Sequence, residues 1–428
     1  MAVMSLHCKL FFLLVLFLPT QLGFHFWPDW ATILGRKIDF LSPTVYFTDI
    51  IIFAMLVFWL LENQRYRSIL TSLFSINLFH KCILVGTGVY VFFNILFAHS
   101  ANVAFISWIK LLEYILLGVY VYQQRISFSD IIKPLAIGTF IASIVGISQY
   151  VFQRSIGGVL WFLGERSFVL DTPAIARVTI CRLFSTSCEL RLRAYSTFSH
   201  PNVFGGYLAI TLPLLLVEVL KNIHSTVKRN IYGSVYVLGV VALVLCFSRS
   251  AWIVSTFGMI CIISLRQKIV ALRLPLILAL CGVVFVGFLV APIQDESFIV
   301  RQQLNTASIA IWQRSPYIGV GLNNFLFGLS PTLQSHQVYV LQPVHNVYLL
   351  ALSQMGVIGL SLAWIYVMVF VKSVGGVALR FSPFYISVLS LFLLGIVDHY
   401  LFTLQQGQLL FSVMTAMSAV AIKFPSKS

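Results

Sequence analysis

Charged residues are scarce in this 428-residue sequence: Asp, Glu, Lys and Arg make up 10% of it, and hydrophobic residues make up 59%. A soluble domain carries about 25% charged residues, so the composition excludes a soluble fold of this length. A lipid bilayer explains it, because side chains that face lipid need no cover from water. In a membrane protein, the positions of the basic residues behind the net charge of +15 indicate the topology. We therefore expect no nucleic-acid partner.

Acidic residues are especially rare in the segments expected outside the membrane. These segments hold Asp29, Asp39, Glu165, Asp171, Glu189, Asp295 and Glu296. They contain no Asp-x-Asp, and no His/Cys cluster has metal-ligand spacing. We therefore expect no metal and no cofactor. The sequence also lacks a linker, a low-complexity tract and a convincing repeat, which predicts a single membrane domain over residues 1–428.

Long apolar runs dominate what is present, and they predict an all-α, polytopic membrane protein. We expect about twelve transmembrane helices, near residues 9–25, 45–61, 82–98, 103–121, 132–152, 202–220, 231–248, 250–266, 273–291, 346–371, 384–401 and 407–423. The first resembles a signal sequence, but no small-x-small cleavage site follows it, so we interpret it as an uncleaved helix.

The distribution of lysine and arginine predicts the orientation. With the N-terminus inside, every short inside segment is basic, as the positive-inside rule requires. These segments contain Lys9, Arg65, Arg67, Lys81, Arg125, Lys133, Lys221, Lys228, Arg229, Arg266, Lys268, Arg273, Lys372, Arg380, Lys423 and Lys427. Both termini are therefore expected in the cytoplasm.

Two long loops, 153–201 and 292–345, are then extracytoplasmic, and their basic residues are all arginine. Arginine offers a planar fork that binds phosphate or carboxylate with two hydrogen bonds; compositional drift is the alternative. Within the second loop, Phe298–Trp312 has apolar residues at helical spacing and predicts an amphipathic helix. Cys181 and Cys188 share the first loop, and we hypothesise a disulfide between them.

His345 and Asn346 stand at the entrance of the helix expected near 346–371, preceded by Pro343. Imidazole has a reference pKa near 6.5 and accepts a proton at neutral pH. The alternative is a histidine that only hydrogen-bonds headgroups or backbone. Gly356 and Gly359, further along, favour close helix contacts.

Three arginines map to the same outer face as His345. Arg249 lies between two apolar helices, where an unpaired charge is costly. Arg193 opens a stretch that leads through His200, Pro201 and Asn202 into the next helix. Arg301 precedes Pro316–Phe325, whose glycines permit a tight turn with amides that face an anion. A turn or cap is the structural alternative for Arg249 and Arg193.

Four further ionisable residues favour structural roles. Lys110 and Glu113 lie one turn apart inside a helix, which predicts an internal neutralising pair. Asp398 and His399 end the helix near 384–401. They could line an acceptor site, but we favour a structural role.

These stretches resemble the O-antigen ligase and O-antigen polymerase superfamily of bacterial inner-membrane glycosyltransferases. The resemblance rests on Arg193–Leu208 with its Thr-Phe-x-His-Pro-Asn core, Ser248-Arg249-Ser250-Ala251, Arg301–Phe325 with Pro-x-x-Gly-x-Gly, and His345-Asn346-x-Tyr348-Leu349 with Gly356 and Gly359. They cover the second half of the chain; the first half matches only in hydropathy.

The resemblance implies a GT-C-like fold in the bacterial inner membrane and glycan transfer from undecaprenyl diphosphate to a lipid or glycan acceptor at the extracytoplasmic face. It implies an essential histidine at His345 and diphosphate-binding arginines at Arg193, Arg249 and Arg301. Asn346, His200 and Asn202 would support them. Direct displacement predicts inversion of the anomeric configuration. The shared motifs leave a ligase, a polymerase or a protein O-oligosaccharyltransferase open.

A transporter or flippase for lipid-linked sugars is the rival from another class. Transporters place ionisable residues near the bilayer midplane, where only Lys110 and Glu113 are expected here. A signalling receptor is a second non-enzyme alternative, but we find no soluble cytoplasmic domain in this sequence that would carry a signal. The outer position of the remaining candidates therefore favours surface chemistry.

Overall fold

A computed structural model describes residues 5–62, 77–181, 188–222, 225–265, 274–275, 277–278, 281–282, 295–332, 341–373 and 382–424. The α-helices are α1 (Leu6–Leu16), α2 (Phe47–Leu61), α4 (Leu78–Leu96), α5 (Ala101–Gln123), α6 (Phe128–Phe152), α7 (Pro201–Lys221), α8 (Thr226–Leu245), α9 (Arg249–Leu265), α11 (Asp295–Arg314), α12 (Phe325–Leu329), α13 (Val347–Ser373), α14 (Pro383–Gly395), α15 (Tyr400–Thr403) and α16 (Gln405–Lys423).

Short strands and one-turn helices fill the loops. The strands are β1 (Gly23–His25), β2 (Thr32–Ile33), β3 (Arg36–Lys37), β4 (Thr44–Tyr46), β5 (Arg177–Cys181) and β6 (Cys188–Leu192). They pair antiparallel as β1–β4, β2–β3 and β5–β6. The 3-10 helices are η1 (Asp29–Ala31), η2 (Asp39–Leu41), η4 (Gly158–Leu163) and η6 (Ser330–Thr332).

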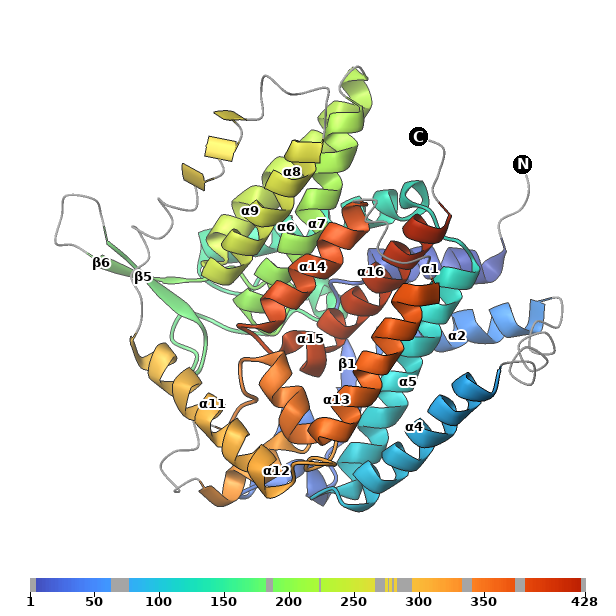
Figure 1. Cartoon of the computed structure of the whole chain (residues 1–428). Coiled ribbons are helices and arrows are strands. Elements are labelled where there is room, and N and C mark those ends of the chain that lie inside the picture. Colours follow the sequence, from blue (N-terminus) through green and yellow to red (C-terminus); the bar gives the residue numbers. More distant parts are fainter. Residues whose placement is uncertain are drawn as a thin grey trace.

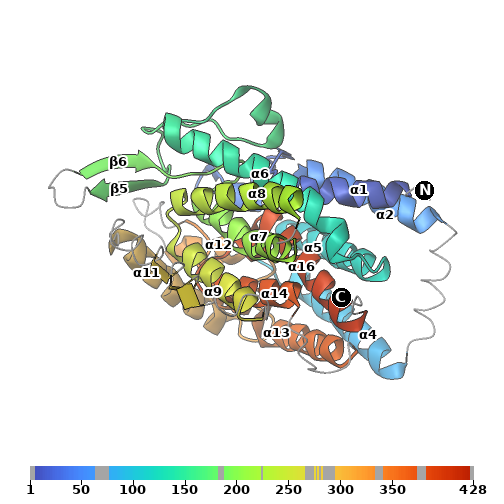
Figure 2. The same ribbon diagram turned by 90° about the horizontal axis from the view of Figure 1, so that it is seen from above.

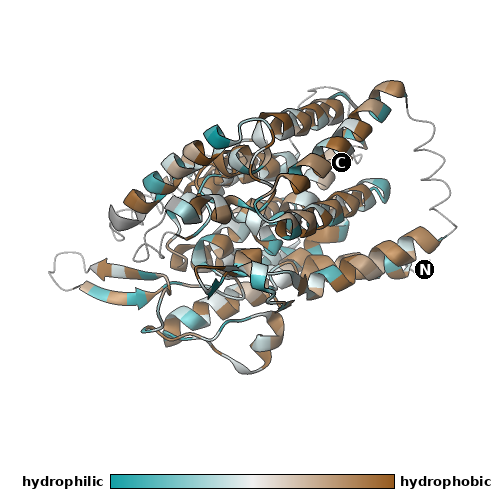
Figure 3. Ribbon diagram, turned by 90° about the horizontal axis from the view of Figure 1, so that it is seen from below, coloured by the Kyte–Doolittle hydropathy of each residue, from teal (hydrophilic) through white to brown (hydrophobic). Residues whose placement is uncertain are grey.

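The chain is a mainly helical, multi-pass membrane protein. Among the described residues, six helices are long and apolar enough to cross a bilayer: α4, α5, α6, α7, α8 and α13. Each coincides with a helix expected from the sequence. Hydrophobic residues predominate along the helical ribbons (Figure 3). The helix expected at 273–291 lies largely outside the described residues, so the count of twelve stays a prediction.

The first expected helix, 9–25, is shorter than predicted. α1 ends at Leu16, and the chain then continues through Pro19 into β1. Proline has no N–H to continue a helix, and residues beyond it form the β1–β4 pair instead. At 11 residues, α1 is well below the roughly 20 residues of a simple transmembrane helix.

The helix expected at 384–401 is interrupted. α14 ends at Gly395, and the short helix α15 starts at Tyr400. Between them the carboxylate of Asp398 accepts the backbone N–H of His399 at 2.8 Å. A side-chain acceptor of this kind competes with the helical hydrogen bond, and the interruption turns Asp398 and His399 into loop residues.

α7 lies at the centre of the bundle and packs against α8, α9 and α14 (Figure 1). Its residues are almost all buried. α1 begins and α16 ends on one side of the molecule, and α11 and α12 lie on the opposite side (Figure 1). The β5–β6 hairpin extends away from the bundle (Figure 2).

The predicted helix at Phe298–Trp312 is confirmed by α11. Its apolar residues face inward: Leu304 and Ile311 are buried, and Val300 and Ala307 pack against the same cluster. The cluster also takes in Phe325 of α12 and other loop side chains. α11 therefore buries its apolar face against the first part of α13 and the neighbouring loops.

α13 is bent sharply at Gly356, where φ is 62° and ψ is −174°. Two side chains of α4 satisfy backbone groups that the bend exposes. The hydroxyl of Tyr90 donates to the carbonyl of Met355 at 2.7 Å, and the amide of Asn94 donates to the carbonyl of Gln354 at 3.1 Å. Hydrogen bonds from α4 therefore hold the bend in one geometry.

We expect Gly356→Ala to lower the free energy of unfolding by about 2–3 kcal/mol. A side chain disfavours this positive φ, and a Cβ would lie 2.4 Å from the carbonyl oxygen of Tyr317. Thermal unfolding in detergent measures the effect. Gly88→Ala in α4 is the matched control, because a Cβ there meets nothing within 4 Å. Equal melting temperatures for the two variants would contradict the role of the bend.

Candidate functional site

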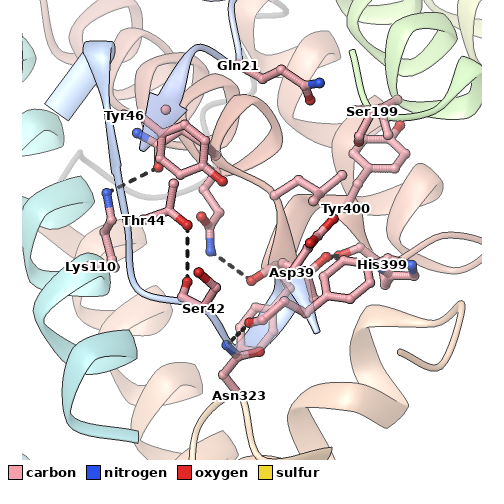
Figure 4. A pocket seen from close by; sticks show the side chains of 18 of the residues that line it. Gln21, Asp39, Ser42, Thr44, Tyr46, Lys110, Ser199, Asn323, His399 and Tyr400 are labelled. Atoms are coloured by element: carbon pink, nitrogen blue, oxygen red, sulfur yellow. Dashed lines mark hydrogen bonds between the residues drawn. The ribbon is translucent and has the colours of Figure 1, made fainter. Parts of the chain in front are cut away.

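A cavity of about 710 Å³ opens among the loops beside α5, α13 and α16. The loop 21–46, one face of α5 and residues near 161–174 and 199–203 line it, together with the turn at Leu322 and Asn323. His345, Gln354 and residues between 398 and 408 complete the lining. Its size falls within the range of about 300–1,000 Å³ that holds small-molecule ligands. Figure 4 shows side chains from these segments turned toward one another.

His345 lines this cavity and is close to Asp398. Its Nδ1 lies 3.6 Å from Asp398 Oδ1, and its Nε2 lies 3.1 Å from Gln342 Oε1. The first distance exceeds a hydrogen bond, and Nδ1 is buried without another partner. Catalytic hydrogen bonds are often long before substrate binds. A small movement therefore makes a His–Asp pair at Nδ1, while Nε2 contacts Gln342, which also lines the cavity.

Asp398 connects the elements around the site. Its Oδ2 accepts from the amide of Asn202 at 3.2 Å, and its Oδ1 accepts from the N–H of His399. Burial opposes ionisation, but His345, His399 and Arg301 outweigh it and hold the pKa of the carboxyl well below its usual range. Asp398 is therefore a carboxylate at neutral pH, placed to orient an imidazole.

Arg193 reaches Asp398 through Asn202. Its Nη2 donates to Asn202 Oδ1 at 2.7 Å, and its Nε donates to the carbonyl of Cys246 at 2.7 Å. Burial lowers the pKa of the guanidinium to about 10, so it stays charged at neutral pH. The contact with Cys246 brings Arg193 to the turn where Arg249 begins α9.

Arg301 approaches from α11. Its Nη1 donates to the carbonyl of Val397 at 3.0 Å, immediately before Asp398. Three of the four motif stretches thus meet around Asp398, through Asn202, Val397 and His345. Arg193, Arg249 and Arg301 do not line the cavity, and among the described residues the arginine that lines it is Arg166. Arg166 donates to the carbonyl of Ser199 at 3.3 Å.

Of the expected supporting residues, Asn346 caps a helix, whereas His200 and Asn202 contact each other near the cavity. Asn346 caps α13, because its side-chain oxygen accepts the N–H groups of Tyr348 and Leu349 at 3.0 Å. His200 lines the cavity, and its Nδ1 accepts the N–H of Asn202 at 3.1 Å. Burial, followed by the charge of Arg193, lowers the pKa of His200 to about 3. His200 is therefore neutral at pH 7 and serves as an acceptor.

The glycine turn after Arg314 does not offer its amides to an anion, as we had expected. The N–H of Gly319 donates to the carbonyl of Ser315 at 3.0 Å, and that of Gly321 donates to the carbonyl of Gln354 at 3.1 Å. A Cβ at Gly319 would lie 2.3 Å from Gln354. The turn therefore packs against the bend of α13 and supports the site indirectly.

Lys110 has a closer partner than Glu113. Its ammonium contacts Asp49 of α2, and Glu113 Oε2 lies 3.4 Å away. The predicted internal pair is thus a three-residue group that includes a second helix. Gln405 joins it through hydrogen bonds to Asp49 and Lys110. Lys110 and Gln405 of this group line the cavity, where Figure 4 shows Lys110 beside Tyr46.

His345, Asp398 and His399 have ligand atoms within 4.8 Å of one another, close enough to hold a metal ion. Sequence spacing did not reveal this group, because 53 residues separate its two parts. The surroundings favour an anion instead: Arg301 contacts the residue before Asp398, and Arg193 contacts Asn202, which binds Asp398. Two guanidiniums already outweigh one carboxylate and disfavour a dication.

The strand register places Cys181 directly opposite Cys188 in the β5–β6 hairpin. Cys188 is disulfide-bonded. The side chain of Cys181 lies outside the described residues, so the pairing of these two cysteines stays a prediction.

Sequence reasoning underestimated Asp398 and missed the contribution of the first half of the chain. Asp398 does line the cavity, with His399, in addition to its structural contacts. The available signal was a rare acid beside a histidine at the outer end of an apolar helix. The loop 21–46 gave no motif, and only the fold brings it opposite His345.

Residues 234–364 match the family model for O-antigen ligase. This stretch contains Arg249, Arg301 and His345, but neither Arg193 nor Asp398. No curated protein matches the chain. The matched domain contains the histidine that lines the cavity, and the match supports a relationship to the O-antigen ligase and polymerase superfamily.

Proposed function

We propose that the chain is a glycosyltransferase that moves a glycan from undecaprenyl diphosphate to an acceptor, lipid A–core or a similar molecule. One observation carries the proposal. Within an O-antigen ligase domain, His345 faces a 710 Å³ cavity with Asp398 3.6 Å behind it and arginines around that carboxylate. A base, an orienting carboxylate and fixed positive charge suit the transfer of a glycan from a diphosphate.

The proposed reaction is a direct displacement. Asp398 holds the tautomer in which Nδ1 of His345 carries the proton, so Nε2 accepts the proton of the acceptor hydroxyl. The hydroxyl oxygen then bonds to the anomeric carbon, and the bond from that carbon to the diphosphate oxygen breaks. The leaving diphosphate keeps the electron pair and is already a good leaving group. Attack from the opposite face inverts the anomeric configuration.

The arginines are proposed to stabilise the diphosphate. Arg193 and Arg301 supply positive charge around Asp398, Arg249 is close to Arg193, and Arg166 adds a guanidinium at the cavity surface. Positive charge fixed in place before the reaction lowers the energy of a developing anion. We propose that Arg166 contacts the diphosphate first and that the arginines behind it act mainly through their field.

With this reaction we propose a GT-C-like bundle of twelve helices in the bacterial inner membrane. Both termini would be cytoplasmic, and the loops 153–201 and 292–345 would be extracytoplasmic. Two observations support it: six described helices are long enough to span, and α11 and α12 lie opposite the side where α1 begins and α16 ends (Figure 1).

Reconstituted proteoliposomes test the proposal. The protein would receive an undecaprenyl-diphosphate glycan with either lipid A–core or a second lipid-linked unit. Product on lipid A–core identifies a ligase, and an elongated lipid-linked product identifies a polymerase. An inverted anomeric bond in the product supports direct displacement, and a retained one contradicts it. No product with these acceptors or with a Ser/Thr peptide, using verified donor, would favour the transporter or flippase.

Transfer is expected to be independent of divalent metal. Because guanidiniums already surround Asp398, EDTA should change the initial rate by less than about twofold. The rate in liposomes washed with EDTA, before and after addition of Mg²⁺, Mn²⁺ or Zn²⁺, measures this. A rate that EDTA removes and one of these ions restores would show that His345, Asp398 and His399 bind a metal instead.

A further inference from the structure

The cavity has a second side, which the family domain does not supply. Asp39, Ser42, Thr44 and Tyr46 come from the loop 21–46, and Lys110 comes from α5; all line the cavity. We call these five residues the N-terminal wall. Figure 4 shows Thr44, Tyr46 and Lys110 on one side and His399 and Tyr400 on the other.

The N-terminal wall offers hydrogen-bonding groups and an aromatic ring. Thr44 and Ser42 present hydroxyls, which are held by hydrogen bonds to His25 at 2.9 Å and to the carbonyl of Phe26 at 2.7 Å. Tyr46 begins α2 with its backbone N–H bound to Asp49 at 2.8 Å. Fixed hydroxyls beside a ring suit a ligand that has both hydroxyl groups and an apolar face, such as a sugar ring.

The two sides of the cavity differ in charge. On the N-terminal wall, Lys110 is paired with Asp49, which does not line the cavity, and Glu113 lies 3.4 Å away. Asp39 is exposed, and it forms no ion pair within the part of the chain that the structure describes. Arg36 and Lys37 are near in sequence but do not line the cavity. The opposite side has Arg166 and Glu165 at its surface, and Arg193 and Arg301 behind Asp398.

We propose that the N-terminal wall binds the acceptor saccharide and selects neutral or amino sugars over acidic ones. This inference rests on the proposed function, and it adds the side from which the acceptor approaches His345. A diphosphate is attracted to the arginine side and repelled by Asp39, which leaves the N-terminal wall to the acceptor saccharide. The acceptor hydroxyl then approaches His345 from the side opposite the leaving group, as inversion requires.

Asp39→Lys and Asp29→Lys form a matched pair that tests the wall. Both aspartates are exposed, and each begins a one-turn helix in the same loop, η2 and η1. Only Asp39 lines the cavity. Equilibrium binding to protein in nanodiscs, without donor, would compare a neutral trisaccharide with the same trisaccharide carrying one uronic acid.

Wild type should prefer the neutral trisaccharide. Asp39→Lys should shift the preference toward the acidic one by roughly tenfold at low salt and by less at high salt. Asp29→Lys should stay within about twofold of wild type. No binding of the neutral trisaccharide by wild type, no shift in Asp39→Lys, or an equal shift in both variants would overturn the inference. Because no donor is present, this result is independent of whether transfer occurs.

Discussion

His345→Ala is expected to lower the rate of glycan transfer by about 10³-fold, within the usual range for loss of a general base. The imidazole is the group between the cavity and Asp398, and its side chain is 18% exposed, so substrate can reach it. Neither His200 nor His399 replaces it. Burial lowers the pKa of His399 to about 4, and that of His200 lies near 3, which makes both weak bases.

Initial rates in proteoliposomes, with the protein amount fixed, measure this effect. His80→Ala is the control, because His80 is in the first turn of α4 and does not line the cavity. It should keep the wild-type rate. His345→Gln should be nearly as slow as His345→Ala, since an amide hydrogen-bonds but does not take the proton. If His345→Gln retains most of the rate, then His345 positions the acceptor and is not a base.

Asp398→Asn is expected to lower the same rate by about 10²–10³-fold with little change in the affinity for donor. An amide at this position does not hold the Nδ1–H tautomer of His345, and loss of the orienting carboxylate in a Ser-His-Asp triad acts in the same way with a larger effect of about 10⁴-fold. The contacts with Asn202 and His399 make the asparagine variant preferable to alanine, which leaves those groups unpaired.

The free energy of unfolding as a function of pH measures what the carboxylate of Asp398 contributes to the fold, and a control variant separates that contribution from its effect on the rate. The folded pKa of Asp398 lies well below the unfolded value of about 3.9, so the ionised carboxylate stabilises the fold above that value. This contribution is lost as the pH falls below about 4, and it is absent from Asp398→Asn at every pH. Asp130→Asn is the control, because Asp130 also accepts a backbone N–H, that of Ser127 at 2.9 Å, but lies away from the cavity. It should lose stability without losing rate; a slow Asp130→Asn would contradict the assignment.

Hydropathy and spacing predicted the elements that depend on local pattern. The six long helices, the buried face of α11 and the loop position of His345 follow from runs and periodicity within a few turns of chain. The same information does not locate partners. Lys110 was assigned to Glu113 one turn away, whereas its nearer contact, Asp49, comes from α2.

The parts of the site that escaped prediction depend on tertiary contacts. Asp398 was hidden in a continuous apolar run, because the break between α14 and α15 is made by its own side chain and by the residues that surround it. The bend at Gly356 depends on Tyr90 and Asn94 of another helix. Arg193 and Arg301 do approach Asp398, but side-chain packing keeps them off the cavity lining and leaves Arg166 at its surface. That the arginines share one face of the membrane stays a prediction.

The central claim is that His345 and Asp398 act as one unit. A double-mutant cycle with His345→Ala, Asp398→Asn and the double variant tests it most directly, by kcat in proteoliposomes. A paired base and orienting acid predict that the double variant is no more than about threefold slower than His345→Ala alone. Rate losses that multiply, so that the double variant is slower by the product of the two single effects, would show that the residues act independently and would contradict the account.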